Sequence, residues 1–584
     1  MLRIPRILTK PSFLQALRPA SRPSLGRTFV PRAQWRNAST STGGTASTRR
    51  KFGFLSGGAL LALGLSPFYA SHIHADAVAP DETEDLSLGA LIRTYVVYTM
   101  CSIPTLVDNS PKLMQLATLP GIRWFAETFV RITFFDQFVG GDTAQNTLPL
   151  LYKLRATNKG ALFAYSVEVD EAEATASSSK GTQAERSPYK RIVDEMVHCV
   201  DVAADFEDRI SGKVHTGRKT WVAVKLSALL PDAEVLIKLS SHLLTTRPRL
   251  PIAFPGCPHS TDLDVLDKPP VEPSQRPGAL TAEDIAALRE LHVDLVRICT
   301  RAQQRGVKII IDAEYSWYQP AIDALTLSLT RQFNKLPSRS NPDASHVQPL
   351  VYGTYQAYLR RTPEHLAQSL ADAKAGNYAL GVKLVRGAYH PHELAAHAAG
   401  LAHNPSLSIS PDAQPPVWSM KPETDACYNE CLRVLINAIR EDVDTRRPRG
   451  LPQTPAVAAL FGTHNWESCE LLLQELVKTG LAFKGPEEGS LVLLPDDVTE
   501  RVTIGQLYGM HDDLTNHLVN TTASNTPLII KYVPYGALSE VMPYLSRRAI
   551  ENKSVLGEGM AGRERRRAAA EIKRRLFGSW FAMN

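Results

Sequence analysis

The amino-acid sequence predicts an α/β fold, a distorted, TIM-like (β/α)8 barrel with an N-terminal helical region and long loop insertions. Eight short apolar, β-branched runs follow one another along the chain, and stretches with helical spacing of apolar residues separate them. This alternation favours a parallel sheet, and eight units favour a sheet that closes on itself. An open, doubly wound sheet is the alternative fold, because its strands and helices also alternate along the chain.

Residues 1–36 are predicted to be a mitochondrial presequence. The first 51 residues contain eleven Arg or Lys residues and many Ser and Thr residues, and the first acidic residue is Asp76. This composition is typical of a mitochondrial presequence. A disordered basic arm that binds nucleic acid is the alternative. Leu, Ile and Phe interleave with the basic residues of the early stretch, so we expect no nucleic-acid partner.

Residues 37–84 contain an apolar segment and a linker. Phe52 to Ala70 carries no charged residue over nineteen positions, which is just long enough to cross a bilayer. Gly57, Gly58, Gly64 and Pro67 weaken this segment as a membrane helix. Three alternatives are open for this segment: a membrane anchor, part of a sorting signal, or a buried apolar segment. We expect it to associate with a membrane.

Residues 85–154 show helical spacing of apolar residues, and residues 155–556 carry the alternating pattern. Three connections are polar or rich in Pro and Ser, so we expect exposed, mobile insertions at 171–187, 251–277 and 403–416. The predicted strands are 160–167, 221–226, 307–313, 349–356, 381–385, 456–463, 502–507 and 528–533. The predicted helices include 189–206, 281–305, 320–335, 363–375, 423–440 and 466–479.

Polar residues stand at the carboxyl ends of seven predicted strands, the edge at which barrels of this kind collect their chemistry. One polar residue at a strand end is more often a loop contact than a catalyst, but seven in one mouth favour an active site. They are Lys225, Asp312 with Glu314, Gln356, the segment Arg386 to Tyr389, His464 with Asn465, Gln506, and Tyr532.

The segment after the eighth strand places four functional side chains on one helix face. Tyr544, Arg547, Arg548 and Glu551 are spaced i, i+3, i+4 and i+7. Two neighbouring guanidinium groups suit a carboxylate ligand, so we expect a small anionic or zwitterionic substrate. A solvated helix with an internal Arg–Glu pair is the alternative for this stripe taken by itself.

Taken together, these segments resemble the proline dehydrogenase family over roughly residues 155–556. The resemblance implies an FAD enzyme that oxidises L-proline to Δ1-pyrroline-5-carboxylate by hydride transfer to flavin N5 and passes the electrons to a membrane quinone. It also implies a mitochondrial enzyme on the matrix side of, or associated with, the inner membrane. The matching segments are Val224 to Ser227, Asp312 to Glu314, Tyr355 to Tyr358, Lys383 to Tyr389, Thr463 to Asn465, Leu507 to Met510 and Tyr544 to Asn552.

The resemblance implies a role for each matching residue. The catalytic set would be Lys225, Asp312, Arg547 and Arg548, with the two arginines clamping the substrate carboxylate and Lys225 paired with Asp312 beneath the substrate. The substrate pocket would also include Tyr544, Tyr532, Tyr389 and Leu507. The FAD would be bound by Asp312, Gln356, Lys383, Val385, Gly387, Ala388, Tyr389, Thr463, His464, Asn465, Gln506, Arg548 and Glu551.

Three positions distinguish this chain within the resemblance. Lys383 stands where bacterial relatives often have Arg, and His390 stands where some relatives have Trp against the cofactor. Tyr532 would pack over the part of the ring where hydroxyproline carries its hydroxyl group, which favours proline as the substrate. Hydroxyproline dehydrogenase and a non-catalytic, membrane-tethered barrel are the alternative functions.

Other signals predict no further cofactor site. The seven scattered cysteines indicate a reducing compartment, and Cys427 with Cys431 is a pair of core thiols rather than a metal site. Gly557 to Gly562 matches the GxGxxG fingerprint but lacks a preceding strand, so we expect a helix terminator there. Residues 557–584 form a predicted basic amphipathic tail that either binds an anionic membrane or is a solvated helix.

Overall fold

The computed structural model describes residues 87–108, 123–166, 188–212, 215–248, 250–267, 279–337, 347–446, 454–485, 491–552 and 560–581. The chain divides into the units 1–79 and 80–584, and all described residues belong to the second. The predicted presequence, the apolar segment 52–70 and the insertion 171–187 lie outside the described residues. Across the described part of the chain, none of the helices combines the length and apolarity needed to span a bilayer.

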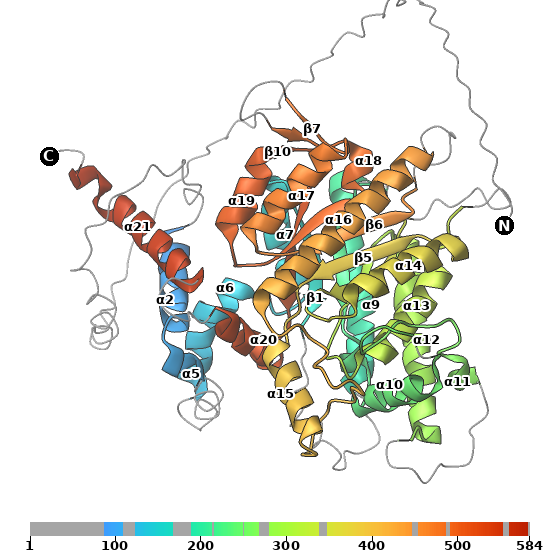
Figure 1. Ribbon diagram of the computed structural model, residues 1–584. Coiled ribbons are helices and arrows are strands. Elements are labelled where there is room, and N and C mark those ends of the chain that lie inside the picture. The colour runs from blue at the N-terminus through green and yellow to red at the C-terminus, as the bar shows by residue number, and fades with distance from the viewer. Residues whose placement is uncertain are drawn as a thin grey trace, which may run out of the picture. The chain divides into compact units, whose positions relative to one another are not determined.

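Eight parallel strands close into a barrel in the order β1-β11-β9-β6-β5-β4-β3-β2, which confirms the predicted fold class and rules out the open sheet (Figure 1). Each predicted strand run overlaps one barrel strand. The barrel strands are β1 (Lys159–Tyr165), β2 (Thr220–Val224), β3 (Ile309–Ile311), β4 (Val351–Gln356), β5 (Leu380–Val385), β6 (Val457–Gly462), β9 (Val502–Leu507) and β11 (Ile529–Tyr535).

Helices surround the barrel because their apolar faces pack on the outward-facing strand residues. Helix α12 shows how the sequence sets an element: Thr281 and Asp284 form a capping box at its start, and Gly306 ends it at a φ of 65°. The larger surrounding helices are α9 (Pro188–Ser211), α10 (Glu234–Thr246), α12 (Ala282–Arg305), α13 (Gln319–Phe333), α14 (Thr362–Gly376), α15 (His390–Leu401), α16 (Lys421–Arg446), α17 (Trp466–Lys478) and α19 (Asp512–Thr521).

A second small sheet and several short helices complete the barrel domain. The sheet was not predicted from the sequence, because its strands have only two residues each and show no periodicity. It contains β7 (Phe483–Lys484), β8 (Val492–Leu493) and β10 (Thr522–Ala523). The short helices are η5 (Leu226–Leu229), α11 (Asp264–Asp267) and α18 (Asp496–Thr499).

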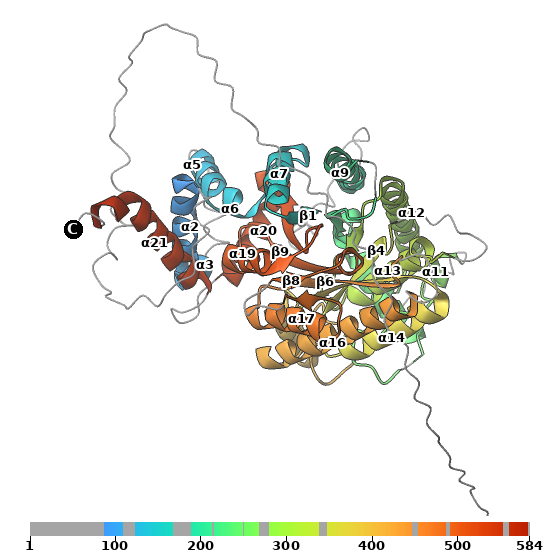
Figure 2. The ribbon, with the colours of Figure 1, turned by 90° about the horizontal axis from the view of Figure 1, so that it is seen from above.

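The N-terminal region is helical as predicted, and it packs against the two C-terminal helices. Helix α2 (Leu88–Cys101) lies along α21 (Met560–Phe581), and α20 (Leu538–Glu551) shares an apolar core with α2 and α6 (Figure 2). The predicted tail is therefore a packed helix, with Ala561 and Ala568 buried. The remaining N-terminal helices are α3 (Pro104–Asp108), α5 (Arg123–Val130), η3 (Arg131–Phe135), α6 (Asp136–Phe138), η4 (Gln145–Thr147) and α7 (Leu148–Ala156).

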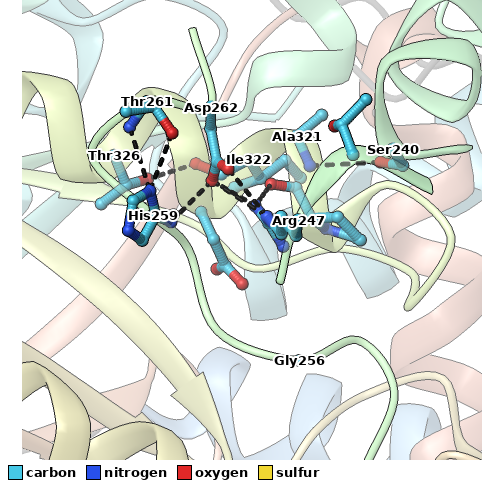
Figure 3. Close-up of polar contacts among 12 residues, drawn as sticks. Ser240, Arg247, Gly256, His259, Thr261, Asp262, Ala321, Ile322 and Thr326 are labelled. Carbon is cyan, nitrogen blue, oxygen red and sulfur yellow. Dashed lines mark hydrogen bonds and ion pairs between the residues drawn. The ribbon is translucent and has the colours of Figure 1, made fainter. Parts of the chain in front are cut away.

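The predicted exposure of insertion 251–277 is wrong for its described part, residues 251–267. Phe254, Cys257 and Asp262 are buried. The Asp262 carboxylate accepts hydrogen bonds from the Arg247 guanidinium and from the backbone N–H of His259 (Figure 3). Composition predicted a mobile loop because it does not reveal this long-range ion pair. The insertion 403–416, by contrast, is largely exposed, as predicted.

Candidate active site

A cavity of about 550 Å³ lies at the carboxyl ends of the barrel strands, where the sequence predicts the chemistry. The strand ends and one face of α20 form its wall. Every residue assigned above to substrate or cofactor lines this single cavity. These residues are Lys225, Asp312, Gln356, Lys383, Val385, Gly387, Ala388, Tyr389, Thr463, His464, Asn465, Gln506, Leu507, Tyr532, Tyr544, Arg547, Arg548 and Glu551.

Helix α20 presents its predicted polar stripe to the cavity rather than to solvent. Its backbone starts at the turn after β11, where the Glu540 carboxylate accepts the N–H of Ala537 at 3.0 Å. Tyr544 is 3% exposed and Arg548 4% exposed. The solvated helix is therefore ruled out, although the Arg–Glu pair of that alternative is present: Arg548 donates to Glu551 at 2.6 Å.

Aromatic rings hold both guanidinium groups in place. Arg547 donates to the hydroxyl of Tyr389 at 3.3 Å and lies 5.5 Å from the centre of that ring. Arg548 lies 4.9 Å from the centre of the Tyr544 ring. The Nε of Arg548 is buried and has no hydrogen-bond partner among the described residues. A buried donor of this kind is unfavourable unless a ligand accepts its hydrogen bond.

Asp312 is the centre of a second polar group on the cavity wall. Lys383 pairs with its Oδ1 at 2.5 Å, and the hydroxyl of Tyr532 donates to its Oδ2 at 3.1 Å. Burial, followed by the Asp312 charge, raises the pKa of Tyr532 well above its usual value, so this phenol stays protonated and donates. Lys225 lines the same cavity, and its predicted pairing with Asp312 stays a prediction.

Glu314 is a buried carboxylate just beyond this group. Burial raises its pKa, while the nearby charge of Lys225 and hydrogen bonds from Ser227 oppose that rise. Both carboxylate oxygens accept hydrogen bonds from Ser227, one from its backbone N–H at 3.0 Å and one from its hydroxyl. Glu314 therefore serves to hold the loop after β2, and it does not line the cavity.

His464 offers the cavity a hydrogen-bond donor. Its Nε2 accepts the backbone N–H of Leu507 at 3.1 Å, so in the neutral ring the hydrogen is on Nδ1. Burial lowers the pKa of His464 well below its usual value, which keeps the ring neutral. Nδ1 is buried and has no hydrogen-bond partner among the described residues. The ring stacks on His511 at 4.8 Å, which holds its orientation.

The turn after β5 brings backbone close to the cavity. Gly387 has a φ of 119°, and a Cβ at this position would lie 2.6 Å from the Tyr358 ring, so a side chain is excluded. Gln356, from the end of β4, donates to the Glu314 carbonyl at 3.1 Å and to the Tyr358 hydroxyl at 3.2 Å, while its Oε1 is buried and has no partner. Buried atoms that lack partners thus lie on three sides of the cavity.

Sequence reasoning missed several cavity residues. Arg386 bridges Asp425 at 2.6 Å, Thr463 at 2.7 Å and Ser468 at 2.9 Å, and so joins β5, β6 and α16. It lies within the matching segment Lys383 to Tyr389 but was given no individual role. His511 and Arg563 also line the cavity. No local pattern marks them, because their positions depend on how α19 and α21 pack.

An aromatic stack extends from the cavity wall. Tyr315 lies between Tyr389, at 4.2 Å between ring centres, and Trp317, at 4.4 Å. The next residue, Ser316, donates to Glu393 of α15 through its backbone N–H at 2.7 Å and through its hydroxyl at 2.5 Å. The loop after β3 therefore fixes the start of α15 and, with it, the Tyr389 ring beneath Arg547.

A family model described as "Proline dehydrogenase" matches residues 163–559, from within β1 to beyond α20. This chain belongs to the proline dehydrogenase family. The matched residues include the end of β1, the other seven barrel strands and the striped helix, so the proline dehydrogenase model covers every residue that lines the cavity except Leu162 and Arg563.

Curated relatives agree with the family assignment. "Proline dehydrogenase 1, mitochondrial" of Dictyostelium discoideum is 29% identical over 84% of this chain and 73% of its own length. "Proline dehydrogenase 1, mitochondrial" of Arabidopsis thaliana is 28% identical over 83% of each. "Hydroxyproline dehydrogenase" of Rattus norvegicus is 27% identical over 84% of this chain and 91% of its own length. Names for both imino acids therefore occur among relatives of similar identity.

A solved structure of proline utilization A (PutA) from Bdellovibrio bacteriovorus, inactivated by N-propargylglycine, is also similar to this chain. The two share 17% identity with a TM-score of 0.48 over 80% of this chain. This chain covers 37% of that longer protein.

Proposed function

We propose that this proline dehydrogenase uses FAD to oxidise L-proline to Δ1-pyrroline-5-carboxylate. The observation that supports this most strongly is the pair Arg547 and Arg548 on the cavity face of α20. Two guanidinium groups, one of them buried, provide a site for one carboxylate, and Tyr389, Tyr532 and Leu507 line the same cavity.

The clamp determines where the ring of the substrate lies. A carboxylate bound by Arg547 and Arg548 leaves the pyrrolidine ring between Tyr389, Tyr532 and Leu507, which line the same cavity. Positioning of this kind lowers the barrier because the reacting carbon no longer has to find its orientation. Apolar walls also exclude water from the ring, which strengthens the ion pair at the carboxylate.

The residues present fit FAD. His464 Nδ1, Gln356 Oε1 and Arg548 Nε are buried polar atoms without partners, and a flavin dinucleotide carries both donors and acceptors. Val385, Ala388, Thr463, Asn465, Gln506 and Glu551 would complete the binding wall together with the backbone at Gly387. When bound, the flavin would supply the oxidising group that takes a hydride from the ring carbon next to nitrogen.

The amine proton has no dedicated acceptor in this proposal. Asp312 is paired with Lys383 and accepts from Tyr532, and Glu314 is bound to Ser227. Neither carboxylate is poised as a base, since each is already stabilised by donors. The protein would therefore hold the substrate amine where solvent takes its proton, while Lys225 and Lys383 keep the cavity wall positive.

Proline is favoured over hydroxyproline by Tyr532. Its hydroxyl is engaged by Asp312 at 3.1 Å, and Lys383 lies 5.2 Å from its ring centre, so the ring is held in one position. A tyrosine held in this way would conflict sterically with an added hydroxyl on the substrate ring. Hydroxyproline dehydrogenase is the second candidate function, because relatives with that name are 27% identical.

The electrons would pass to a membrane quinone at the mitochondrial inner membrane. Curated relatives named as mitochondrial support the compartment. The exposed basic side chains of α21, namely Arg563, Arg566, Lys573 and Arg574, would dock the protein on anionic lipid. Because α21 packs on α2, charge reversal tests docking better than deletion. Arg566→Glu with Lys573→Glu should release the folded protein from anionic vesicles, and unchanged sedimentation with the vesicles would contradict the docking.

Steady-state kinetics with a soluble quinone analogue test the substrate. We expect kcat/KM for L-proline to exceed that for trans-4-hydroxy-L-proline by at least about tenfold, because one steric conflict costs on the order of 1–3 kcal/mol. Tyr532→Ser should lower the ratio of kcat/KM for L-proline to kcat/KM for trans-4-hydroxy-L-proline. A higher value for hydroxyproline would support the second candidate, and no turnover of either compound would contradict both.

A further inference from the structure

Beside the cavity, three side chains with metal-binding atoms converge from segments that are distant in sequence. His511 and Asp513 stand at the start of α19, and Glu564 stands near the start of α21. One nitrogen or oxygen atom from each lies within 4.8 Å of the atoms from the other two. Among the described residues this is the one cluster of its kind.

His511 is buried and Asp513 and Glu564 are half-buried, and the three side chains have few partners among the described residues. Asp513 Oδ1 is buried and accepts no hydrogen bond from a described residue. His511 is 7% exposed, and its only partner among described side chains is the stacked ring of His464. No hydrogen bond or ion pair joins Glu564 to the rest of the described chain. Neighbouring Asp512, by contrast, pairs with Lys531 at 3.0 Å.

Among the described residues, the positively charged side chains near the cluster form no ion pair with Asp513 or Glu564. Lys531 is bound to Asp512, to the Met510 carbonyl at 3.0 Å and to the Thr515 hydroxyl at 2.7 Å. Arg563 and Arg567 are close enough to act on the cluster through space. Two neighbouring carboxylates that are withdrawn from water repel each other, and only a proton or a cation removes that cost.

We propose that His511, Asp513 and Glu564 bind one divalent transition-metal ion, for which Zn²⁺ is the natural probe. One imidazole nitrogen and two carboxylate oxygens are a ligand set that such ions accept, at about 2.0–2.2 Å each. Ligand atoms around one ion lie closer together than 4.8 Å, so binding draws the Glu564 side chain toward α19. Water completes the coordination.

The ion would have a structural role that is separate from the proposed oxidation. It would tie α21 to the barrel at α19, across the 553–559 segment that follows α20. It would also fix His511, and through their stacking contact His464, at the cavity wall.

Zinc titration of the flavin-loaded protein tests this site. The protein is first dialysed against a chelator, and Zn²⁺ binding is then followed by calorimetry, with metal content measured after gel filtration. We expect one Zn²⁺ per chain, a rise in Tm, and slower hydrogen exchange of the α21 backbone. Glu564→Gln and Asp513→Asn should each weaken Zn²⁺ binding by at least about tenfold and remove the rise in Tm.

His517→Gln is the matched control. It removes an imidazole from the same helix, where His517 pairs with Glu470 at the surface, and it leaves the cluster intact. We expect it to bind Zn²⁺ like the unchanged protein. Equal binding by all three variants, or no stoichiometric binding by the unchanged protein, would overturn the proposal. If one ligand variant fails to fold, the other decides the outcome.

Discussion

Among single residues, Arg548 is the most important for the proposed binding of the substrate carboxylate. It is 4% exposed, has Glu551 as its carboxylate partner at 2.6 Å and lies against the Tyr544 ring. A guanidinium this deeply buried needs further partners, and the cavity supplies none of its own for Nε. The substrate carboxylate and the flavin are the ligands that would satisfy it.

Arg548→Ala should raise the KM for L-proline steeply. Loss of a buried, charge-assisted pair costs on the order of 2–5 kcal/mol, which corresponds to about 30-fold or more in KM. Steady-state kinetics of flavin-saturated protein measure this change. Arg433→Ala is the control, since Arg433 is half exposed and pairs with Glu475 away from the cavity. An unchanged KM for Arg548→Ala would count against the clamp.

Tyr315 acts through Tyr389 rather than by touching the substrate. Removing its ring with Tyr315→Leu leaves Tyr389 without its stacking partner, and such a contact contributes about 0.5–1.5 kcal/mol. We expect a KM for L-proline about two- to tenfold higher with a smaller change in kcat. Tyr152→Leu, which removes an exposed ring that packs on the buried Phe206 away from the cavity, should leave both unchanged. A fall in kcat without a change in KM would contradict a positioning role.

The sequence predicted the members of the site better than their contacts. Strand ends and helix spacing are local patterns. They correctly predicted that Lys225, Asp312 and Arg548 line one cavity. The Asp312–Lys383 pair depends on which way side chains point inside the barrel, and periodicity carries no information on that. The positions of His511 and Arg563 depend on helix packing, so they were missed for the same reason.

Among the elements, the segment 250–267 shows how one ion pair orders a loop. Arg247 and Asp262 have side-chain exposures of 9% and 3%, and the guanidinium also donates to the Pro320 carbonyl at 3.1 Å (Figure 3). The Arg247–Asp262 pair therefore connects the end of α10, the loop and α13. Composition predicted mobility here because Pro is frequent, but the folded chain supplies a buried partner.

Asp262→Ala should lower the free energy of unfolding by about 3–5 kcal/mol, because it leaves a buried guanidinium without its carboxylate. Glu441→Ala breaks the Lys374–Glu441 pair, whose side chains are 83% and 70% exposed, and should change stability by less than about 1 kcal/mol. Denaturant unfolding of both variants measures the difference. Equal effects would show that burial of the Arg247–Asp262 pair does not matter.

His365 of α14 should make the barrel sensitive to acid. Burial and then the Arg361 charge lower its pKa from 6.5 to about 3, while Asp323 opposes the shift and Arg247 adds to it. Between these values the unfolded chain binds a proton that the folded chain does not. Stability therefore falls as the pH drops below 6.5, and the loss continues to about pH 3.

His365→Phe keeps an aromatic ring against Tyr355 and removes the titration. From pH 6.5 to 5, the unchanged protein should lose about 2 kcal/mol more of its unfolding free energy than the variant does. Urea unfolding at the two pH values measures the difference. The same slope in both proteins would mean that other groups cause the acid sensitivity.

For the whole molecule, the closed barrel followed from the sequence because eight parallel units have few ways to bury both faces of a sheet. The packing of α21 on α2 did not follow, since a basic helix at the chain end reads equally well as a membrane tail. Its small residues Ala561 and Ala568 are buried, whereas Arg566, Lys573 and Arg574 are exposed. Helix α21 thus packs through one face and exposes basic side chains for the proposed docking on the other.

The most direct measurement of the central claim is anaerobic titration of the purified protein, followed through the visible absorbance of its flavin. The account predicts a yellow protein whose flavin band bleaches on addition of L-proline, and an Arg547→Ala, Arg548→Ala double variant that retains flavin on reconstitution but bleaches only at far higher proline concentrations. A colourless protein that takes up no FAD, or bleaching at the same proline concentration in both proteins, would contradict it.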